Sequence, residues 1–524
     1  MKMLKTLSLI GIAILACSCA QLPTDYQSER TTAITDTDDT ALGLRSIAVR
    51  QALTDESRFI PVTSGVDAFF MRAALTVMAE RSLDIQYFLW HKDLTGQILL
   101  KFVLDAADRG VRVRLLLDDL DNQALDPEFY ALDTHPNISI RLFNPFATRG
   151  FKYVDFLTDT SRINRRMHNK SFTADNQYTI VGGRNIGDEY FDAETHSNFY
   201  DMDALATGPV VEKVSIQFDI YWNHETAVPV SAFKHNTATA SDLENVRNSL
   251  TEYFESHRDS PYVDDLKASG IVDVLRGGKY PAYTGTAEVL YDDPGKGLGL
   301  DPEDYASMSD LMRPYLINLK RELILISPYF VPGDSAVAAY TRRIEEKGIE
   351  VNVLTNSYGS TDSPPVHAGY SRYREALLAG GVQIFELKSS SRKKRRKGSV
   401  ASDSEASLHT KMFIFDRESV FIGSLNLDPR SIDINTEMGI LYHSPELARQ
   451  MAYELGDGAL EHVYELKLVK SPAESKGEFT TYTWSIEWLE RVDGKIIRHT
   501  SEPDVGLWDQ FILFFSGILP ESQI

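Results

Sequence analysis

One composite motif occurs twice in this chain. HNKSFTAD begins at His168 and HTKMFIFD begins at His409, so both copies have the form HxKxxxxD. Six residues separate each aspartate from a glycine-containing turn that ends in asparagine, GGRN at 182–185 and GSLN at 423–426. A pattern of this length that recurs in matched order indicates an internal duplication. The chain is therefore expected to fold as two similar halves.

The segments that precede the two motifs repeat as well. A strand pattern, an amphipathic helix pattern and a second strand pattern follow one another at 83–119 and again at 322–357. Each helix pattern ends at a glycine, Gly110 or Gly348. Strand, helix and strand joined by short turns form a parallel βαβ unit. We predict an α/β fold with two pseudo-symmetric lobes, each a mixed or parallel sheet flanked by helices.

The remaining segments differ from the repeat in composition. Residues 20–45 are polar and rich in Thr and Asp, which is typical of a tether. The predicted organisation is a signal peptide at 1–19, a polar tether at 20–45, a first lobe at 46–230, an inter-lobe connection at 231–285, a second lobe at 286–470 and a C-terminal subdomain at 471–524.

The motif itself predicts phosphate chemistry. On a strand, His and Lys two positions apart share one face, so an imidazole and an ammonium would project into one site. Imidazole can attack phosphorus or move a proton near neutral pH, and the ammonium compensates the charge of phosphate oxygens. Two copies that meet at the lobe interface would supply both an attacking histidine and a proton donor. No metal or other cofactor is expected, because Lys170 and Lys411 already supply positive charge.

These motifs resemble the phospholipase D superfamily over most of the chain. The phrases RMHNKSFTAD, VGGRNIGDEYF, ISPYFVP and GSLNLDPRS are most similar to its bacterial cardiolipin synthase branch, particularly the type C members. The resemblance implies a covalent phosphohistidine, commonly on the first-lobe residue His168, with His409 as acid and base. Which histidine is the nucleophile stays open at this point.

The same resemblance implies the rest of the site. The residues expected around the phosphate are Lys170, Lys411, Asn185 and Asn426, and those expected to orient the histidines are Asp201 and Glu437. Because the first turn has Gly183 where the second has Ser424, we expect a hydroxyl contact to phosphate from one side only. Asp175 and Asp416 complete the two motifs, and a structural role fits them better than that of a proton donor.

The net charge and the cysteine content limit the classes of protein to which this chain can belong. The 524 residues include 54 basic and 75 acidic ones, a net charge of -21, which argues against nucleic acid as the main partner. The 2 cysteines exclude a disulfide scaffold and a cysteine-rich zinc module. Cys17 follows an apolar run in ILAC, which resembles the lipobox of bacterial lipoproteins, with Cys19 as the alternative lipidation site. A plain secretory signal or an uncleaved anchor is the other interpretation.

We therefore expect a lipid-anchored enzyme of a bacterial envelope, with its catalytic part outside the cytoplasm. The expected reaction makes cardiolipin from phosphatidylglycerol and a second phospholipid at a membrane surface. A hydrolytic phospholipase D, a superfamily nuclease and a non-enzymatic lipoprotein are the alternatives. The basic run Arg392–Lys397 is either a solvated loop or an attractor of anionic headgroups.

Other conspicuous groups are given non-catalytic interpretations. The tripeptide His91 to Asp93 lacks the motif spacing and is predicted to form a turn. The acidic cluster Asp118, Asp119 and Asp121 is predicted to be a solvated loop. His367 either lines a substrate channel or has a surface or capping role, and the apolar segment 508–519 is predicted to be buried rather than to touch a membrane.

Overall fold

The computed structural model describes residues 22–53, 55–149, 155–194, 197–269, 281–300, 303, 305–389, 405–455, 457–476 and 479–516. The predicted signal peptide with Cys17 and Cys19, and the run Arg392–Lys397, lie outside the described residues. Among the described helices, none combines the length and the apolar character that crossing a membrane requires.

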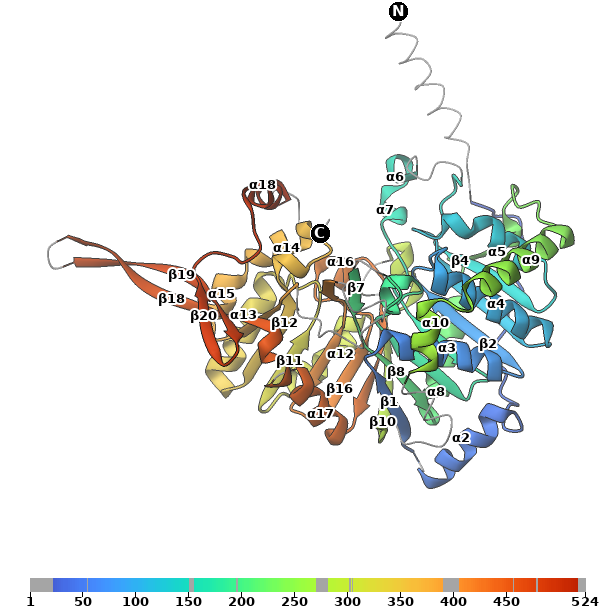
Figure 1. The fold of residues 1–524 in the computed structure, drawn as a ribbon, viewed down its shortest axis with the longest axis horizontal. Helices are drawn as coiled ribbons and strands as arrows, with labels where there is room; N and C mark the ends of the chain where they lie inside the picture. Colours follow the sequence, from blue (N-terminus) through green and yellow to red (C-terminus); the bar gives the residue numbers. More distant parts are fainter. Residues whose placement is uncertain are drawn as a thin grey trace, which may run out of the picture.

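Each lobe is built on one mixed sheet (Figure 1). The first-lobe strands are, in spatial order, β9 (Ala227–Pro229), β4 (Ile138–Phe143), β3 (Arg112–Asp118), β2 (Ser82–Tyr87), β5 (Ser171–Ala174), β6 (Tyr178–Gly182), β8 (Asp203–Thr207) and β1 (Ser57–Val62). The second-lobe strands are, in the matching order, β18 (Val463–Lys476), β13 (Gln383–Leu387), β12 (Glu350–Asn356), β11 (Glu322–Ile326), β15 (Met412–Phe415), β16 (Ser419–Gly423), β17 (Met438–His443) and β10 (Tyr283–Tyr291).

The two strand orders correspond one to one, so the duplication predicted from the sequence is present in the fold. β2 pairs with β3 in parallel and β11 pairs with β12 in parallel, as the predicted βαβ units require. The equivalent edge strands β1 and β10 pair antiparallel and join the two sheets. A short parallel pair, β7 (Ser197–Tyr200) and β14 (Glu405–Leu408), connects the lobes a second time. The prediction of a two-lobed α/β fold is confirmed.

Helices flank both sheets (Figure 1). Those that precede β10 are α2 (Ala41–Ala52), α3 (Gly65–Met78), α4 (Leu94–Asp108), α5 (Asp126–Leu132), α6 (Asp155–Thr158), α7 (Thr160–Ile163), α8 (Pro209–Trp222), α9 (Ala240–His257) and α10 (Pro261–Lys267). Those that follow it are α12 (Met308–Ile317), α13 (Gly333–Lys347), α14 (Pro364–Ser371), α15 (Arg374–Ala379), α16 (Pro429–Asp433), α17 (Pro445–Leu455) and α18 (Leu507–Ser516).

Buried apolar side chains hold the lobes together as well as each lobe by itself. Besides one core in each lobe, a third cluster contains residues of both, such as Phe59, Met202, Met412 and Tyr442. The rings of Phe59 and Tyr442 meet edge to face, with centroids 4.1 Å apart. Because this shared core removes apolar surface of both lobes from water, the lobes have a fixed arrangement and can form one site between them.

Two segments differ from the predicted organisation. The sequence predicts a tether at 20–45, whereas the backbone N–H groups of Thr31 and Ala33 donate to the side chains of Asn223, the C-cap of α8, and Asp219. In addition, the side chain of Gln177 donates to Thr37. This part of the segment therefore packs on the first lobe. The predicted boundary at 470/471 falls inside β18, which pairs with β13 and with β19 (Phe479–Val492), so the long hairpin extends the second-lobe sheet. β20 (Lys495–His499) adds one more strand.

Candidate active site

The two motif histidines lie between the lobes, in the segments that lead into equivalent strands. His168 and Lys170 come directly before β5, and His409 and Lys411 lie between β14 and β15. The motif spacing predicts that each His–Lys pair lies on a strand, whereas the structure places both pairs just before the strands β5 and β15. The reason is that the backbone of each histidine bonds to the opposite lobe instead of continuing the sheet of its own lobe.

The backbone bonds of the two histidines cross between the lobes. The N–H of His168 donates to the carbonyl of Thr436 at 2.8 Å, and the N–H of His409 donates to the carbonyl of Tyr200 at 2.8 Å. Thr436 and Tyr200 are equivalent residues, because each precedes a predicted orienting acid in the sequence. Each histidine is therefore attached to the chain segment that carries the acid of the other lobe.

The side chains cross in the same way. Nδ1 of His168 lies 2.8 Å from Oε2 of Glu437, and Nδ1 of His409 lies 2.6 Å from Oδ2 of Asp201. A carboxylate accepts, so each Nδ1 carries the proton and the lone pair is left on Nε2. Both acids are fully buried. This arrangement prepares two imidazoles whose Nε2 atoms can attack phosphorus or accept a proton.

The two lysines are held by the histidines of their own motifs. Nζ of Lys170 donates to the carbonyl of His168 at 2.7 Å, and Nζ of Lys411 donates to the carbonyl of His409 at 2.6 Å. Both lysine side chains are buried, and burial lowers the pKa of Lys411 to about 8 and that of Lys170 well below its ordinary value. Two buried ammonium groups that repel each other form a site for an anion.

Burial also sets the charge of the histidines. It lowers the pKa of His168 to about 4, although Glu437 acts in the opposite direction. Burial and the ammonium groups of Lys411 and Lys170 hold the pKa of His409 well below its ordinary value. Both imidazoles are therefore neutral at neutral pH, which is the form that a nucleophile or a general base needs.

The two acids, Glu437 and Asp201, differ in the direction in which their pKa is shifted. Burial raises the pKa of Glu437, but His168 and Lys170 lower it more, so that it lies below its ordinary value. Burial raises the pKa of Asp201 above its ordinary value. The site is thus symmetric in geometry and asymmetric in electrostatics, with the more strongly ionised acid beside His168.

Aromatic rings, which the sequence analysis did not single out, enclose both imidazoles. Phe88 packs on His168 with centroids 5.1 Å apart, and Tyr190 and Phe199 pack on His409 at 5.3 and 4.9 Å. Tyr190 lies in the segment VGGRNIGDEYF, five residues after the turn asparagine Asn185. This short distance along the chain is the sequence feature that could have indicated a place near the site. These rings restrict the histidine rotamers and reduce access of water.

Asn185 and Asn426, which end the two glycine-containing turns, occupy equivalent positions but make different hydrogen bonds. Nδ2 of Asn185 donates to Tyr190 at 2.8 Å, and its Oδ1 accepts from the N–H of Leu89 at 3.3 Å. In the described part of the chain, the buried Oδ1 of Asn426 has no hydrogen-bond partner. Because rotation of an amide exchanges its oxygen and nitrogen, Asn426 can offer an N–H to a phosphate oxygen.

Residues 75–222 and 315–457, one segment in each lobe, match the family described as "Cardiolipin synthase, PLD-like domain". The chain belongs to the phospholipase D superfamily. It is 37% identical over 468 residues to cardiolipin synthase C of Escherichia coli (strain K12), a match that covers 88% of this chain and 94% of that protein. It is also 25% identical over 374 residues to cardiolipin synthase B of Shigella flexneri, covering 70% of this chain and 71% of that protein.

A solved structure has the same fold. The crystal structure of phosphatidylserine synthase from Haemophilus influenzae superposes with a TM-score of 0.51 at 14% identity, covering 80% of this chain and 91% of that chain. The protein is thus a phospholipase D-superfamily enzyme related to cardiolipin synthase C, and this relationship implies phospholipid substrates.

Ser424 and Gly183 both lie against the acids that face the histidines. The hydroxyl of Ser424 donates to Oε2 of Glu437 and accepts from the N–H of Met438, so it supports an acid of this phospholipase D site, and its contact with phosphate stays a prediction. A Cβ at Gly183 would lie 2.3 Å from Oδ1 of Asp201. The first lobe needs a glycine there because the carboxylate occupies the space.

The motif aspartates lie at the other end of their hairpins. Asp175, at φ 52°, is a turn residue between β5 and β6, and its carboxylate accepts N–H bonds from Glu80, Arg81 and Ser82. Asp416, at φ 55°, makes the equivalent bonds to residues 320–322. Asp tolerates this left-handed conformation. Their side chains therefore cap the starts of β2 and β11, the structural role favoured above.

The acidic cluster at the end of β3 corrects a second prediction in part, since of its three members only Asp121 is exposed. Asp118 and Asp119 are fully buried instead of solvated. Asp118 accepts from the N–H of Met167 at 2.8 Å and pairs with Arg166 at 3.3 Å, and Asp119 pairs with Arg149. Because Met167 precedes His168, Asp118 helps to position the first motif of the phospholipase D site.

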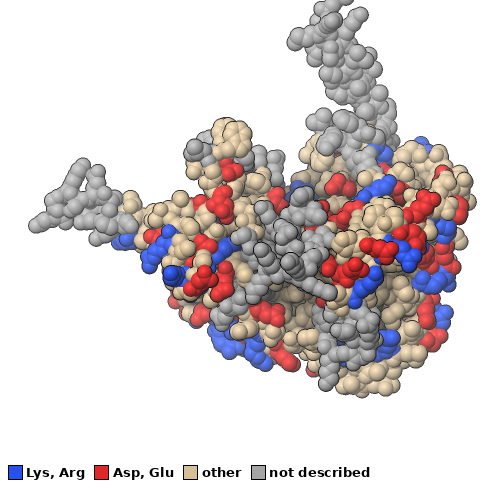
Figure 2. All heavy atoms as spheres, viewed as in Figure 1, with Lys and Arg blue, Asp and Glu red and all other residues tan. Residues whose placement is uncertain are grey.

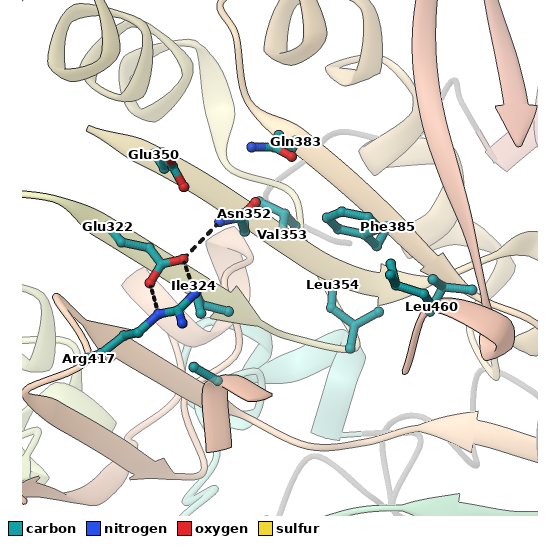
Figure 3. A pocket seen from close by; sticks show the side chains of 12 residues that line it. Glu322, Ile324, Glu350, Asn352, Val353, Leu354, Gln383, Phe385, Arg417 and Leu460 are labelled. Carbon is teal, nitrogen blue, oxygen red and sulfur yellow. Dashed lines mark hydrogen bonds and ion pairs between the residues drawn. The ribbon is translucent and has the colours of Figure 1, made fainter. Parts of the chain in front are cut away.

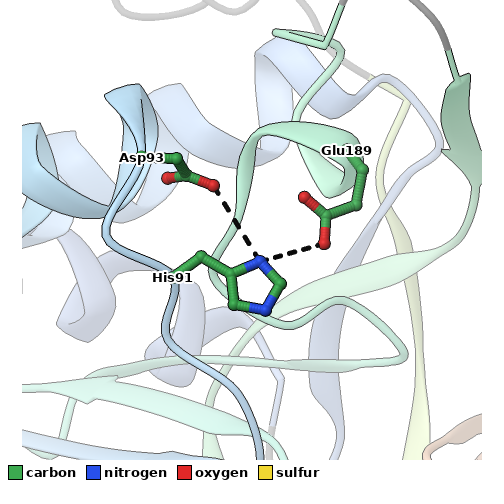
Figure 4. A group of neighbouring side chains, drawn as sticks. All are labelled: His91, Asp93 and Glu189. Carbon is green, nitrogen blue, oxygen red and sulfur yellow. Dashed lines mark ion pairs between the residues drawn. The ribbon is translucent and has the colours of Figure 1, made fainter. Parts of the chain in front are cut away.

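His91, Asp93 and Glu189 form a group with metal-ligand side chains beside the start of α4 (Figure 4). Nδ1 of His91 lies 3.1 Å from Oε1 of Glu189 and 4.0 Å from Oδ2 of Asp93. Both Asp93 oxygens already accept backbone N–H groups, from Gly96 at 2.9 Å and Asp188 at 2.7 Å. Asp93 is therefore the N-cap of α4, and the group is a helix cap with an ion pair.

A cavity of about 210 Å³ lies on the second-lobe sheet (Figure 3). Its polar rim includes Glu322, Glu350 and Gln383, the first residues of β11, β12 and β13. His409 lies at the opposite, carboxyl ends of these strands, because the carbonyl of the preceding residue, Leu408, accepts from Nδ2 of Asn356, the last residue of β12, at 3.0 Å. The cavity is therefore separate from the phospholipase D site.

Proposed function

We propose that this enzyme is a phosphatidyltransferase that makes cardiolipin from phosphatidylglycerol and a second phospholipid. The observation that carries the proposal is the crossed pair of neutral imidazoles, each held through Nδ1 by an acid of the other lobe. The match to cardiolipin synthase C over nearly the full length of both chains supports the choice of substrates.

The proposed first step forms a covalent intermediate. Nε2 of His168 attacks the phosphorus of a phospholipid, and the bond from phosphorus to the departing alcohol oxygen breaks. His409 protonates that oxygen, and Lys170 and Lys411 compensate the charge of the nonbridging oxygens. The bound phosphate anion favours the protonated form of His409 that this step needs. His168 is the proposed nucleophile because Glu437 acts to raise its pKa, whereas burial and the neighbouring cations all act to lower the pKa of His409.

The second step regenerates the enzyme. His409, now neutral, takes the proton from a hydroxyl of phosphatidylglycerol while that oxygen attacks phosphorus. The bond between phosphorus and Nε2 of His168 breaks, and cardiolipin leaves. Attack by water at this stage would release phosphatidic acid, so access of water decides between transfer and hydrolysis.

The test supplies labelled phosphatidylglycerol and a second phospholipid to the purified full-length chain. Labelled cardiolipin, absent with the H168A variant, is the expected product. Phosphatidic acid without cardiolipin would refute the synthase and support the hydrolase. Nicking of DNA in dilute salt, lost in H168A, would support the nuclease, which the net charge of -21 disfavours.

We also propose that the enzyme is a lipoprotein of a bacterial envelope, anchored through Cys17 with its catalytic part outside the cytoplasm. The apolar run before ILAC supports this. Incorporation of labelled fatty acid in cells that is lost in C17S and kept in C19S is the expected result. Loss in C19S alone would move the anchor to Cys19.

A further inference from the structure

α18 presents an aromatic pair to solvent. Trp508 is 70% exposed and Phe511 is 51% exposed, and their rings stack with centroids 5.3 Å apart. They are three positions apart and therefore lie on the same side of the helix. The sequence predicts burial of this segment, and the structure shows these two side chains at the surface. Single exposed apolar residues are ordinary, whereas contiguous ones such as this stacked pair can belong to an interaction surface.

The other side of α18 is attached to the second lobe. α18 packs on α14, and the hydroxyl of Tyr358 donates to Asp509 at 3.0 Å. Just before the helix, Glu502 pairs with the buried side chains of His367 and Arg374, at 2.6 Å each. His367 therefore neither lines a channel nor lies at the surface, but helps to fix the segment that carries α18. The aromatic pair thus has a defined position on the molecule.

That position is on the active-site side of the lobe. Leu427, the residue after Asn426, donates its N–H to the carbonyl of Tyr329, and the Tyr329 hydroxyl donates to Asp362 at 2.8 Å. Asp362 lies two residues before α14, on which α18 packs. A continuous series of contacts therefore connects the catalytic turn with α18.

The surface around the aromatic pair favours lipid over a charged partner. Figure 2 shows mostly uncharged side chains over the described part of α18, with acidic ones just beneath it. The sequence of α18, LWDQFILFFS, contains three polar residues, which are Asp509, Gln510 and Ser516. A helix of 10 residues is about 15 Å long, which suits a position in the plane of a bilayer interface and is too short to cross one. Trp and Phe are the residues that such interfacial helices insert.

We propose that α18 docks the enzyme on the bilayer by inserting Trp508 and Phe511, so that the active-site mouth faces the lipid surface. The inference rests on the proposed phospholipid activity, which requires the headgroup to reach the histidines while the acyl chains stay in the membrane. Because the contact is apolar and the protein is acidic, insertion should require neither anionic lipid nor low salt.

Tryptophan quenching tests the insertion directly. The full-length chain is reconstituted in vesicles that contain brominated phosphatidylcholine, and W508F is compared with W484F. Trp484 is a matched control because it is 52% exposed but lies on β19. We expect the quenched component of the emission to disappear in W508F and to persist in W484F. Equal quenching in wild type and W508F would overturn the proposal.

Activity tests the consequence and separates the two proposals. We expect W508S/F511S to lose about 10-fold or more of its activity on phosphatidylglycerol in vesicles, and to keep its activity on a short-chain phosphatidylglycerol dissolved as monomers. Y453S, which changes a 63% exposed aromatic residue on α17, should keep both activities.

The remaining outcomes are decisive as well. If the wild type makes no cardiolipin from either substrate, the proposed function fails and quenching alone decides the docking. W508S/F511S could instead keep its activity on vesicles and differ from the wild type in its molecular mass in solution. In that case the aromatic pair binds another protein chain, and the membrane proposal is wrong.

Discussion

Nδ1 of His168 lies 2.8 Å from Oε2 of Glu437, a residue 269 positions later in the chain and in the other lobe. The equivalent contact joins His409 to Asp201, 208 positions earlier. Neither lobe therefore contains a complete histidine and acid pair. Both lobes have to fold and pack against each other before either histidine has an acid that holds its proton on Nδ1. Catalysis therefore depends on the shared core that fixes the two lobes together.

The contact between Glu437 and His168 predicts how a substitution of this acid affects kcat. E437Q keeps the shape of the side chain but no longer favours a proton on Nδ1 of His168. We expect kcat to fall by about 10²–10⁴, with KM within a few-fold of wild type. E418Q, at a 59% exposed acid of the same lobe, is the control and should be fully active. Wild-type kcat in E437Q would contradict the orienting role.

Ser424 predicts a shift in the pH profile. Its hydroxyl is one of the groups that lower the pKa of Glu437, so S424A should raise that pKa. The carboxylate that holds the Nδ1 proton of His168 is then lost at a higher pH on acidification. The acid limb of kcat/KM, which protonation of His168 sets in the wild type, therefore moves upward in S424A as protonation of Glu437 comes to limit activity. A rise in KM with an unmoved acid limb would show instead that Ser424 binds phosphate.

The buried cations and imidazoles predict a two-limbed pH dependence of kcat/KM in the free enzyme. The pKa of His168 is about 4, so activity should fall as the pH drops below that value and the nucleophile is protonated. The pKa of Lys411 is about 8, so activity should fall above that value as its charge is lost. K411R should move the alkaline limb upward, and K320R, at an exposed lysine, should not. An alkaline limb that stays in place in K411R would exclude Lys411 as its source.

Sequence patterns predicted the parts of the site that are local in the chain. The motif spacing found both histidines and both lysines, and the periodicity found the βαβ units, because these features depend on residues a few positions apart. The partners of Asp118 and Asp119 could not be found in this way, since an ion pair with Arg166 or Arg149 is formed by the fold. The exposure of Trp508 was missed for a related reason: an apolar helix pattern does not say whether protein or lipid covers it.

The motif aspartates predict an effect on stability rather than on chemistry. D175A leaves the N–H groups of Glu80, Arg81 and Ser82 without their acceptor, so we expect it to lower the free energy of unfolding by about 2–3 kcal/mol. D175N keeps one acceptor oxygen and the tolerance for a positive φ, and should lose less. Urea unfolding measures both. A large loss of kcat in D175N at unchanged stability would mean that Asp175 acts in catalysis.

A buried tyrosine in the shared core predicts a stabilising change. Among the described residues, the buried hydroxyl of Tyr442 has no hydrogen-bond partner, and its ring packs on Phe59. Y442F keeps the ring contact and removes a hydroxyl that is desolvated without compensation, so the free energy of unfolding should rise by about 1 kcal/mol. Y221F is the matched control, because the buried hydroxyl of Tyr221 donates to the carbonyl of Asp292 and its loss should destabilise. Urea unfolding measures both variants, and a loss of stability in Y442F like that expected in Y221F would show that the Tyr442 hydroxyl does have a partner.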